Sequence, residues 1–468
     1  MSDIWKWDAT TTALRVKAGE VSAVEVVDAH LARLDAVNPG VNAVTFDVSD
    51  EARAAAIAAD VRQASGAPTG PLHGVPITIK ENIDVAGQPT PNGLPVLADT
   101  LAVENSPLVN HMLNAGAIIV GRTNTPEFSY RWHTDNPLRG ETKNPWTSER
   151  TPGGSSGGAA SSLALGIGAI AHGNDLGGSL RYPAYCCGLT TIRPTLGRVP
   201  SWNSTAPVER TMSLQVMSTQ GPIARNVRDA RLGLTVMAQP DPHDPWHVPL
   251  PVTGPRVTGP IKVAVTYGPV GTPPAPEVKA AVDQAAAHLA DAGYIVEHID
   301  PPNIDLMVER WAQLLWAETR TGIDFMRQIG STDLMNALDW QMNAFDQLDM
   351  AGYVSALAER SAHLRAWSMF MTEHPLVLSP VSQELPFTPG DDVFSEERLL
   401  EIFPTQTMLI VMNYLGLPAA AVPTGMAGDG PIGVQIAGPR FREDLCLDGA
   451  AAIEERVGPI VPILWERT

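Results

Sequence analysis

Apolar and polar positions divide most of the chain into short apolar runs and longer segments of helical spacing. Mostly apolar runs typical of buried strands lie at 75–80, 117–120, 167–171, 261–266 and 294–298. Helices are predicted between them, at 22–37, 50–65, 106–114, 159–165, 226–237 and 276–292. Strands that alternate with helices favour an α/β fold with a mainly parallel sheet.

The helix that begins after Ser22 carries signals at both ends. Ser22 and Glu25 have the spacing of a capping box, in which each side chain accepts a hydrogen bond from the other residue's backbone amide. Pro39 and Gly40 follow the amphipathic pattern and predict that this helix ends near Val37.

The segment 304–373 has a helical pattern with many large side chains, among them Trp311 and Trp316. One interpretation is a helical core rich in Met and Trp, and the other is a helical cap that covers a substrate site. The Pro-rich segment 240–260 is predicted to be an extended connection on the surface.

Composition narrows the class of protein. The 468 residues could form two or three domains by length alone, and a hydrophobic content of 44% is ample for a large core. A formal charge of −19 argues against a nucleic-acid surface. Because the N-terminal sequence lacks signal-peptide features and no apolar stretch reaches about 18 residues, we expect a cytoplasmic protein without membrane contact.

The cysteines and histidines indicate neither a disulfide framework nor a metal site. The three cysteines are Cys186, Cys187 and Cys446, an odd and low number for a disulfide-stabilised fold. No His/Cys cluster has the spacing of zinc ligands, so no metal is expected.

Two glycine clusters, each with a serine, lie on either side of one apolar run between Thr151 and Pro194. Six of the eight residues at 153–160 are Gly or Ser, and Ser179 lies in the second cluster, GGSLR. One such cluster is more often a turn or linker than a catalytic loop. A phosphate loop is excluded because no lysine follows Gly158, and a nucleophile elbow is disfavoured because polar TSERT replaces the buried strand before it.

A third residue completes the pattern. Lys80 ends an apolar run and precedes Ser155 by 75 positions, and Ser155 precedes Ser179 by 24. With GGSSGG and D-x-GGS-x-R around the serines, this closely resembles the amidase signature family of serine hydrolases. The resemblance continues, in the family's order, through residues 121–146, 193–200, 220–230, 413–423 and 433–451, whereas residues 240–400 match loosely.

The resemblance implies a fold and a domain organisation. It implies one α/β domain over residues 1–468, with a large central mixed, mainly parallel sheet and helices on both faces. The helical region at about 300–400 is the variable part of the domain. No cofactor is implied, the partner is a small-molecule amide or carbamate substrate, and a homodimer is suggested by analogy.

The resemblance also implies a role for each residue of the two loops. Ser179 is the nucleophile, Ser155 is the bridging serine in a cis peptide, and Lys80 is the base. The oxyanion hole consists of successive backbone amides, those of Leu176, Gly177, Gly178 and Ser179. Asp175 and Arg181 flank the nucleophile, and either fix its loop or form a salt bridge with no part in the chemistry.

Physical chemistry is consistent with these roles. A hydroxyl must be deprotonated as it attacks an amide carbonyl, and a lysine accepts that proton only when neutral. Its ordinary pKa is about 10.4, and burial beside an apolar strand lowers it because desolvation disfavours the ammonium. Ser155 can relay the proton between Ser179 and Lys80 and return it to the leaving amine.

Several residues compete with this interpretation or depart from the family pattern. A Ser-His-Asp arrangement could be drawn with His133 or His172, but the family uses lysine. Asn174 stands where many relatives have threonine. Tyr182 stands where glutamine-hydrolysing amidotransferases have glutamine, and together with the acidic charge it argues against that class.

We therefore expect a cofactor-free serine hydrolase that cleaves amide C–N bonds, including those of carbamates. The alternatives are a non-catalytic relative and a glutamine-hydrolysing amidotransferase of the A type. The bulky side chains of Tyr130, Trp132 and His133 are expected to wall the substrate site. Aromatic walls and the lack of a nearby Lys/Arg cluster predict neutral substrates with an aryl or bulky apolar group.

Overall fold

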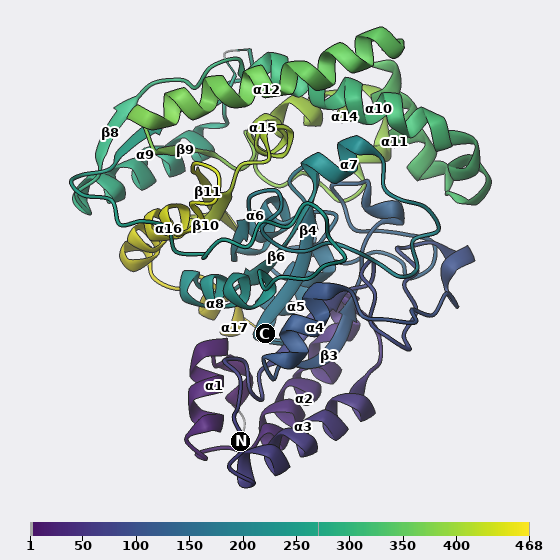
Figure 1. Cartoon of the computed structure of the whole chain (residues 1–468), viewed down its shortest axis with the longest axis vertical. Helices are drawn as coiled ribbons and strands as arrows, with labels where there is room; N and C mark the ends of the chain where they lie inside the picture. Colours follow the sequence, from purple (N-terminus) through teal and green to yellow (C-terminus); the bar gives the residue numbers. More distant parts are fainter. Residues whose placement is uncertain (1–2, 270, 468) are drawn as a thin grey trace.

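The computed structural model describes residues 3–269 and 271–467 and contains one continuous sheet of 11 strands (Figure 1). Across the sheet the strands follow the order β1-β3-β2-β4-β6-β5-β10-β11-β9-β7-β8. Their bounds are β1 Val44–Phe46, β2 Pro76–Lys80, β3 Ile118–Thr123, β4 Ile170–Asp175, β5 Thr190–Arg193, β6 Thr219–Ala224, β7 Lys262–Val265, β8 Ile295–His298, β9 Leu376–Pro380, β10 Ala419–Ala427 and β11 Gly430–Ala437.

The sheet is mixed, as predicted, but its parallel strands are confined to two blocks. β2 is parallel to β3 and β4, and β7 is parallel to β8 and β9. Of the ten pairings between described strands, six are antiparallel, which corrects the expected parallel majority. One of the six, β10 with β11, is joined by the short turn at 428–429, because antiparallel neighbours need no helical crossover.

Helices cover both faces of this sheet, as predicted. Their bounds are α1 Ala9–Lys17, α2 Ala23–Val41, α3 Ser49–Ala64, α4 Pro107–Asn114, α5 Gly157–Ala164, α6 Arg181–Cys187, α7 Met212–Met217, α8 Val227–Met237, α9 Pro276–Asp291, α10 Ile304–Ile329, α11 Thr332–Asn343, α12 Met350–Glu373, α13 Asp391–Phe394, α14 Glu396–Thr405, α15 Thr407–Leu415, α16 Glu443–Val457 and α17 Val461–Trp465. Single 3-10 turns lie at Ile4–Lys6, Pro95–Leu97 and Glu127–Ser129.

Contacts between helices define the two layers. On one face α4, α8, α16 and α9 pack side by side in that order. On the other face α2, α5 and α6 form a second row, and α5 contacts β4 and β6, two strands that α8 also contacts. The central strands are therefore buried on both sides, and β6 is buried at every residue.

The expected helices at 304–373 are α10, α11 and α12. In Figure 1, α12 crosses one end of the molecule, opposite the end formed by α1, α2 and α3. Trp311, Trp316 and Trp367 are all buried, and α10 packs against α7 and α15. Much of this region is thus helical core, and its contribution to the cavity described below is Met326.

Two element boundaries differ from the sequence prediction for identifiable reasons. α2 continues through Pro39 to Val41. Proline in the last turn removes only one backbone hydrogen bond, so it does not end the helix, which instead ends at Asn42 in the left-handed conformation (φ 51°). β4 begins at Ile170 rather than at 167, because Gly168 has a positive φ of 74° and bends the chain before the ladder begins.

Among residues 3–269 and 271–467, no helix is both long enough and apolar enough to cross a membrane.

Candidate active site

Lys80 and the second glycine loop meet because two parallel strands end at one edge of the sheet. Lys80 is the last residue of β2, which is buried throughout, and the adjacent parallel strand β4 ends at Asp175. Parallel neighbours place their carboxyl ends together, so the loop after β4 starts beside the Lys80 side chain.

The first glycine loop places Ser155 in contact with Lys80. A Cβ atom on Gly154 would lie 2.4 Å from the backbone oxygen of Arg131, so only glycine fits there. The Gly154–Ser155 peptide bond is cis. Ser155 Oγ lies 2.7 Å from Lys80 Nζ, while Ser156 Oγ lies 3.3 Å from the same nitrogen.

Burial shifts the Lys80 amine toward its neutral form. The side chain is fully buried, and desolvation holds the pKa of Lys80 well below its usual range, although the Asp175 carboxylate opposes the shift. Asn174 Oδ1, 2.7 Å from Nζ, completes the polar surroundings of the amine. The site therefore contains a lysine that loses its proton more readily than an exposed lysine does.

Ser179 lies in the second glycine loop and lines the same cavity as Ser155. Its side chain is largely buried, with 7% exposure. The preceding Gly178 has a φ of 102°, and a Cβ there would lie 2.5 Å from Leu409 Cδ1, so the tight approach of the loop to α15 requires glycine. The structure thus brings together the three residues expected to carry the chemistry.

Asp175 and Arg181 hold the second loop in place. Arg181 Nε and Nη2 donate to the two Asp175 carboxylate oxygens, each at 3.0 Å, and Asn413 Nδ2 donates to Asp175 Oδ1 at 2.8 Å. Burial would raise the pKa of Asp175, but the Arg181 and Arg193 guanidinium groups hold it well below its usual range. The carboxylate also accepts a hydrogen bond from the Gly178 amide at 2.8 Å.

This last contact narrows the expected oxyanion hole. The Gly178 amide already donates to Asp175, whereas no acceptor is found in the described part of the chain for the amides of Leu176, Gly177 and Ser179. The free donors are therefore these three amides. The Gly178 amide is not part of the oxyanion hole as expected, because one N–H serves one strong acceptor.

Two tryptophans fix the carbonyl groups of the same loop. Trp132 Nε1 donates to Gly177 O at 2.9 Å, and Trp311 Nε1 donates to Leu176 O at 3.1 Å. In a trans peptide the carbonyl and the following N–H point in opposite directions, so the bond to Leu176 O turns the Gly177 N–H to the other side. The two indoles thereby orient the peptide groups of the loop.

Trp132 and His133 were expected to wall the substrate site, but neither lines the cavity. Trp132 is 8% exposed and packs behind the loop against Phe403 at a ring distance of 5.8 Å. His133 is buried between Thr151 Oγ1, 2.9 Å from Nδ1, and Glu141 Oε1, 3.3 Å from Nε2. Sequence alternation could not separate these positions, because both lie in a loop with no regular period.

The remaining residues singled out in the sequence lie in different surroundings. His172 Nε2 lies 2.9 Å from Gln220 Oε1, and burial lowers the pKa of His172 to about 3, so it is neutral and away from the cavity lining. Tyr182 is buried, with its ring stacked on Tyr185 and Phe387. Tyr130 does line the cavity, and its ring lies 6.3 Å from that of Trp316.

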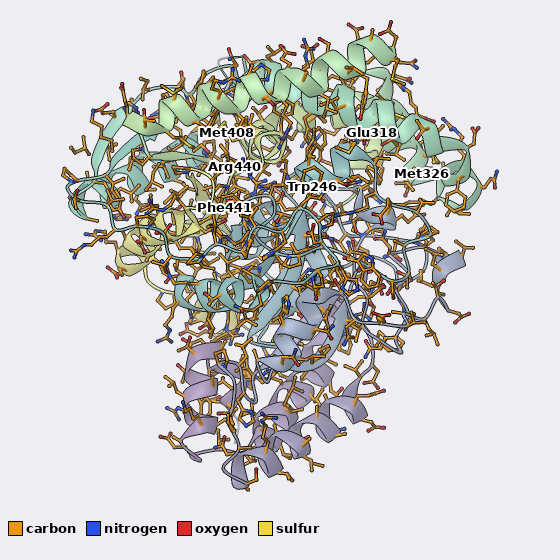
Figure 2. All side chains as sticks on the ribbon, in the orientation of Figure 1. Trp246, Glu318, Met326, Met408, Arg440 and Phe441 are labelled. Carbon is orange, nitrogen blue, oxygen red and sulfur yellow. The ribbon has the colours of Figure 1, made fainter. Side chains whose placement is uncertain are left out.

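The cavity above Ser179 has a volume of about 910 Å³ and is covered largely by segments that the sequence did not single out. Residues from 201–218 and 243–246 form much of its lining, among them Trp202 and Trp246. Figure 2 labels Trp246 and Met326, two lining side chains that come from a loop and from α10. The sequence signal that could have indicated this lining is the presence of tryptophans, Trp202 and Trp246, in otherwise polar connections.

Comparison with known proteins identifies the family. The Amidase family model matches residues 25–447. An indoleacetamide hydrolase of Bradyrhizobium diazoefficiens is 48% identical over 465 residues, which cover 99% of this chain and 89% of that protein. An acylamidase of Rhodococcus erythropolis is 34% identical, with coverage of 95% of this chain and 94% of that protein. The A component of a glutamyl-tRNA(Gln) amidotransferase from Moorella thermoacetica is 30% identical, with coverage of 93% of each.

The solved structures agree with the sequence relatives. A bacterial aryl acylamidase of the amidase signature family superposes with a TM-score of 0.84 at 27% identity, over 98% of this chain and 97% of that one. The chain belongs to the amidase signature family and is an amide hydrolase of that family.

Trp132→Phe is expected to lower kcat about tenfold while leaving KM nearly unchanged. The change removes the hydrogen bond to Gly177 O but keeps an aromatic ring against Phe403. Losing one such bond costs about 1–1.5 kcal/mol, and a loop that no longer holds its donors stabilises the oxyanion less well. Steady-state kinetics on one good amide substrate measure the effect.

Trp146→Phe is the matched control for this change. Trp146 is also 8% exposed, and its Nε1 donates to a backbone oxygen, that of Cys187, at the same distance of 2.9 Å. Equal losses of kcat in the two variants would show that Trp132 acts on stability alone.

Proposed function

We propose that the chain hydrolyses neutral amides bearing an aryl group by a serine mechanism that passes through an acyl-enzyme. The observation that carries the proposal is the 2.7 Å contact between Ser155 Oγ and Lys80 Nζ, at the edge of a cavity that Ser179 also lines. A buried, neutral amine beside a serine relay is the arrangement that activates a hydroxyl nucleophile.

In the proposed acylation, Ser179 Oγ forms a bond to the amide carbonyl carbon. Its proton moves to Ser155, and the Ser155 proton moves to Lys80 Nζ. The oxyanion accepts hydrogen bonds from the amides of Leu176 and Gly177 and from the Ser179 amide, and each such donor is worth about 3–4 kcal/mol in the transition state.

Collapse of the tetrahedral intermediate breaks the C–N bond. The Lys80 ammonium returns its proton through Ser155 to the departing nitrogen, so the amine leaves neutral and Ser179 remains acylated. A water molecule then attacks the ester by the same relay and releases the acid. A carbamate presents the same carbonyl geometry, so an aryl carbamate is a second substrate class for the same groups.

The aryl preference is supported by the cavity and by the relatives. Phe128, Tyr130, Trp202 and Trp246 contribute aromatic surface to the cavity lining. The relative at 48% identity is named an indoleacetamide hydrolase, while the amidotransferase component is at 30%. An aryl amide therefore fits the site better than glutamine does.

A hydrolysis panel tests the substrate class. We expect kcat/KM for indole-3-acetamide, phenylacetamide and acetanilide to exceed that for acetamide and L-glutamine by about 10- to 100-fold, since burying an aromatic ring is worth about 1.5–3 kcal/mol. Aryl carbamates extend the panel, and the amine or ammonia released is measured. Faster turnover of glutamine would contradict the proposal and favour the amidotransferase alternative.

Tyr130→Leu should narrow the ratio between aryl and short aliphatic substrates, because it removes a ring that lines the cavity. Tyr294→Leu is the matched control, since Tyr294 is also half-buried but lies before β8, outside the cavity lining.

A further inference from the structure

Asn174 occupies a special place beside the base. It is the next-to-last residue of β4, pairs with Gln220 of β6, is half-buried and lines the cavity. Its Oδ1 lies 2.7 Å from Lys80 Nζ, as close as Ser155 Oγ. This is the position at which the sequence departs from the threonine of the family pattern, and the departure places an amide oxygen on the catalytic amine.

The hydrogen-bond roles around a neutral amine are strictly limited. Neutral Lys80 has two N–H donors and one lone pair, and an amide oxygen such as Asn174 Oδ1 can only accept. Ser156 Oγ lies 3.5 Å from the backbone oxygen of Asn174, toward which its own hydrogen points, so it meets Lys80 Nζ at 3.3 Å as an acceptor. Both N–H groups are thereby directed to acceptors other than Ser155.

We propose that Asn174 is a positioning residue, which together with Ser156 takes the two N–H groups of neutral Lys80 and leaves the lone pair directed at the Ser155 hydroxyl. Ser155 then donates to Lys80 before the reaction and is free to accept from Ser179. The inference rests on the proposed function, because it describes how the base of that reaction is oriented.

The same contacts serve the protonated state. After transfer Lys80 has three N–H donors, and the three nearby oxygens, those of Asn174, Ser156 and Ser155, can each accept one. The proton that formed the third N–H bond came from Ser155, which has taken one from Ser179, so no proton is gained or lost. A threonine hydroxyl can donate as well as accept, whereas the asparagine oxygen excludes the reversed orientation.

The titratable groups on the strands around Lys80 form other contacts, and none replaces Asn174 in this role. Asp175 on β4 is paired with Arg181 and lies 3.8 Å from Arg193 Nε. His172 on β4 is neutral. Glu81 and Arg122, which lie beside Lys80 in sequence and on the adjacent strand β3, form their own contacts with Arg139 and with Ile83 O, respectively. α5 contributes no titratable side chain.

The test compares Asn174→Thr, Asn174→Leu and Asn174→Asp with the wild type. A serine-directed fluorophosphonate probe reports the second-order rate of Ser179 modification across the pH range, with Ser179→Ala as the unlabelled control. We expect Asn174→Leu to lower the plateau rate by about 10- to 100-fold, and Asn174→Thr to recover most of that loss. Asn174→Asp should move the rising limb of the pH profile upward by about 1–3 pH units, because a nearby carboxylate favours the ammonium.

The outcomes separate the proposed function from the positioning role of Asn174. If wild type does not react at Ser179, the proposed function fails and this inference fails with it. If wild type reacts but Asn174→Leu keeps its plateau, or Asn174→Asp keeps its pH limb, only the role of Asn174 is overturned. Should Asn174→Leu show no cooperative thermal transition, the isosteric Asn174→Asp decides, since its upward shift supports the role and an unchanged limb refutes it.

Discussion

Ser179→Ala is expected to reduce turnover of every amide and carbamate substrate by about 10⁴- to 10⁶-fold, the size seen when a serine hydrolase loses its nucleophile. The residual rate would come from substrate binding and the oxyanion donors alone. Intact-mass measurement after quenching should show an acyl adduct on the wild type and none on the variant. Because the Ser179 side chain has no hydrogen-bond partner elsewhere in the described residues, folding should be unaffected.

Ser162→Ala provides the matched control for that change. Ser162 is fully buried in α5, and its hydroxyl donates locally to Ala159 O at 3.0 Å, so its removal tests the loss of a buried hydroxyl outside the site. An acyl adduct that persists in Ser179→Ala, located by peptide mapping on Ser155 or elsewhere, would overturn the assignment of the nucleophile.

The parts of the fold that depend on local chemistry could be predicted from the sequence. The capping box of Ser22 and Glu25 forms, and the apolar run before Lys80 is the buried strand β2. Helices at 304–373 are also confirmed. Each of these features is decided by residues close together in the chain, where periodicity and capping are informative.

The features that depend on distant contacts were less predictable. The balance of strand directions follows from which strands pair across the whole sheet, and sequence alternation does not specify this. The role of Trp132 depends on a single hydrogen bond to Gly177 O, 45 positions away. Likewise, nothing in the local pattern showed that Asp175 would take the Gly178 amide, or that 201–218 would cover the cavity.

Lys80→Met is the second change with a very large expected effect, a loss of about 10²- to 10⁴-fold in kcat, since it removes the proposed general base but keeps a side chain of similar length. In the wild type the rate should rise with pH, because only neutral Lys80 accepts a proton, and the low pKa of the buried amine brings that rise below the ordinary range near 10.4. The variant should lose this rise, and Lys80→Arg, which stays charged, should be inactive at every pH.

Thermal unfolding separates this catalytic effect from a folding defect. The pKa of Lys80 is lower in the folded protein than in the unfolded chain, so between the two values the unfolded chain binds more protons. The stability of the wild type should therefore gain from this group as pH rises through that window, and Lys80→Met should lack that gain. If Lys80→Met folds cooperatively but loses both the pH dependence of stability and the pH-dependent rate, Lys80 is the buried base. A rate that still rises with the wild-type pH profile would place the base at another residue.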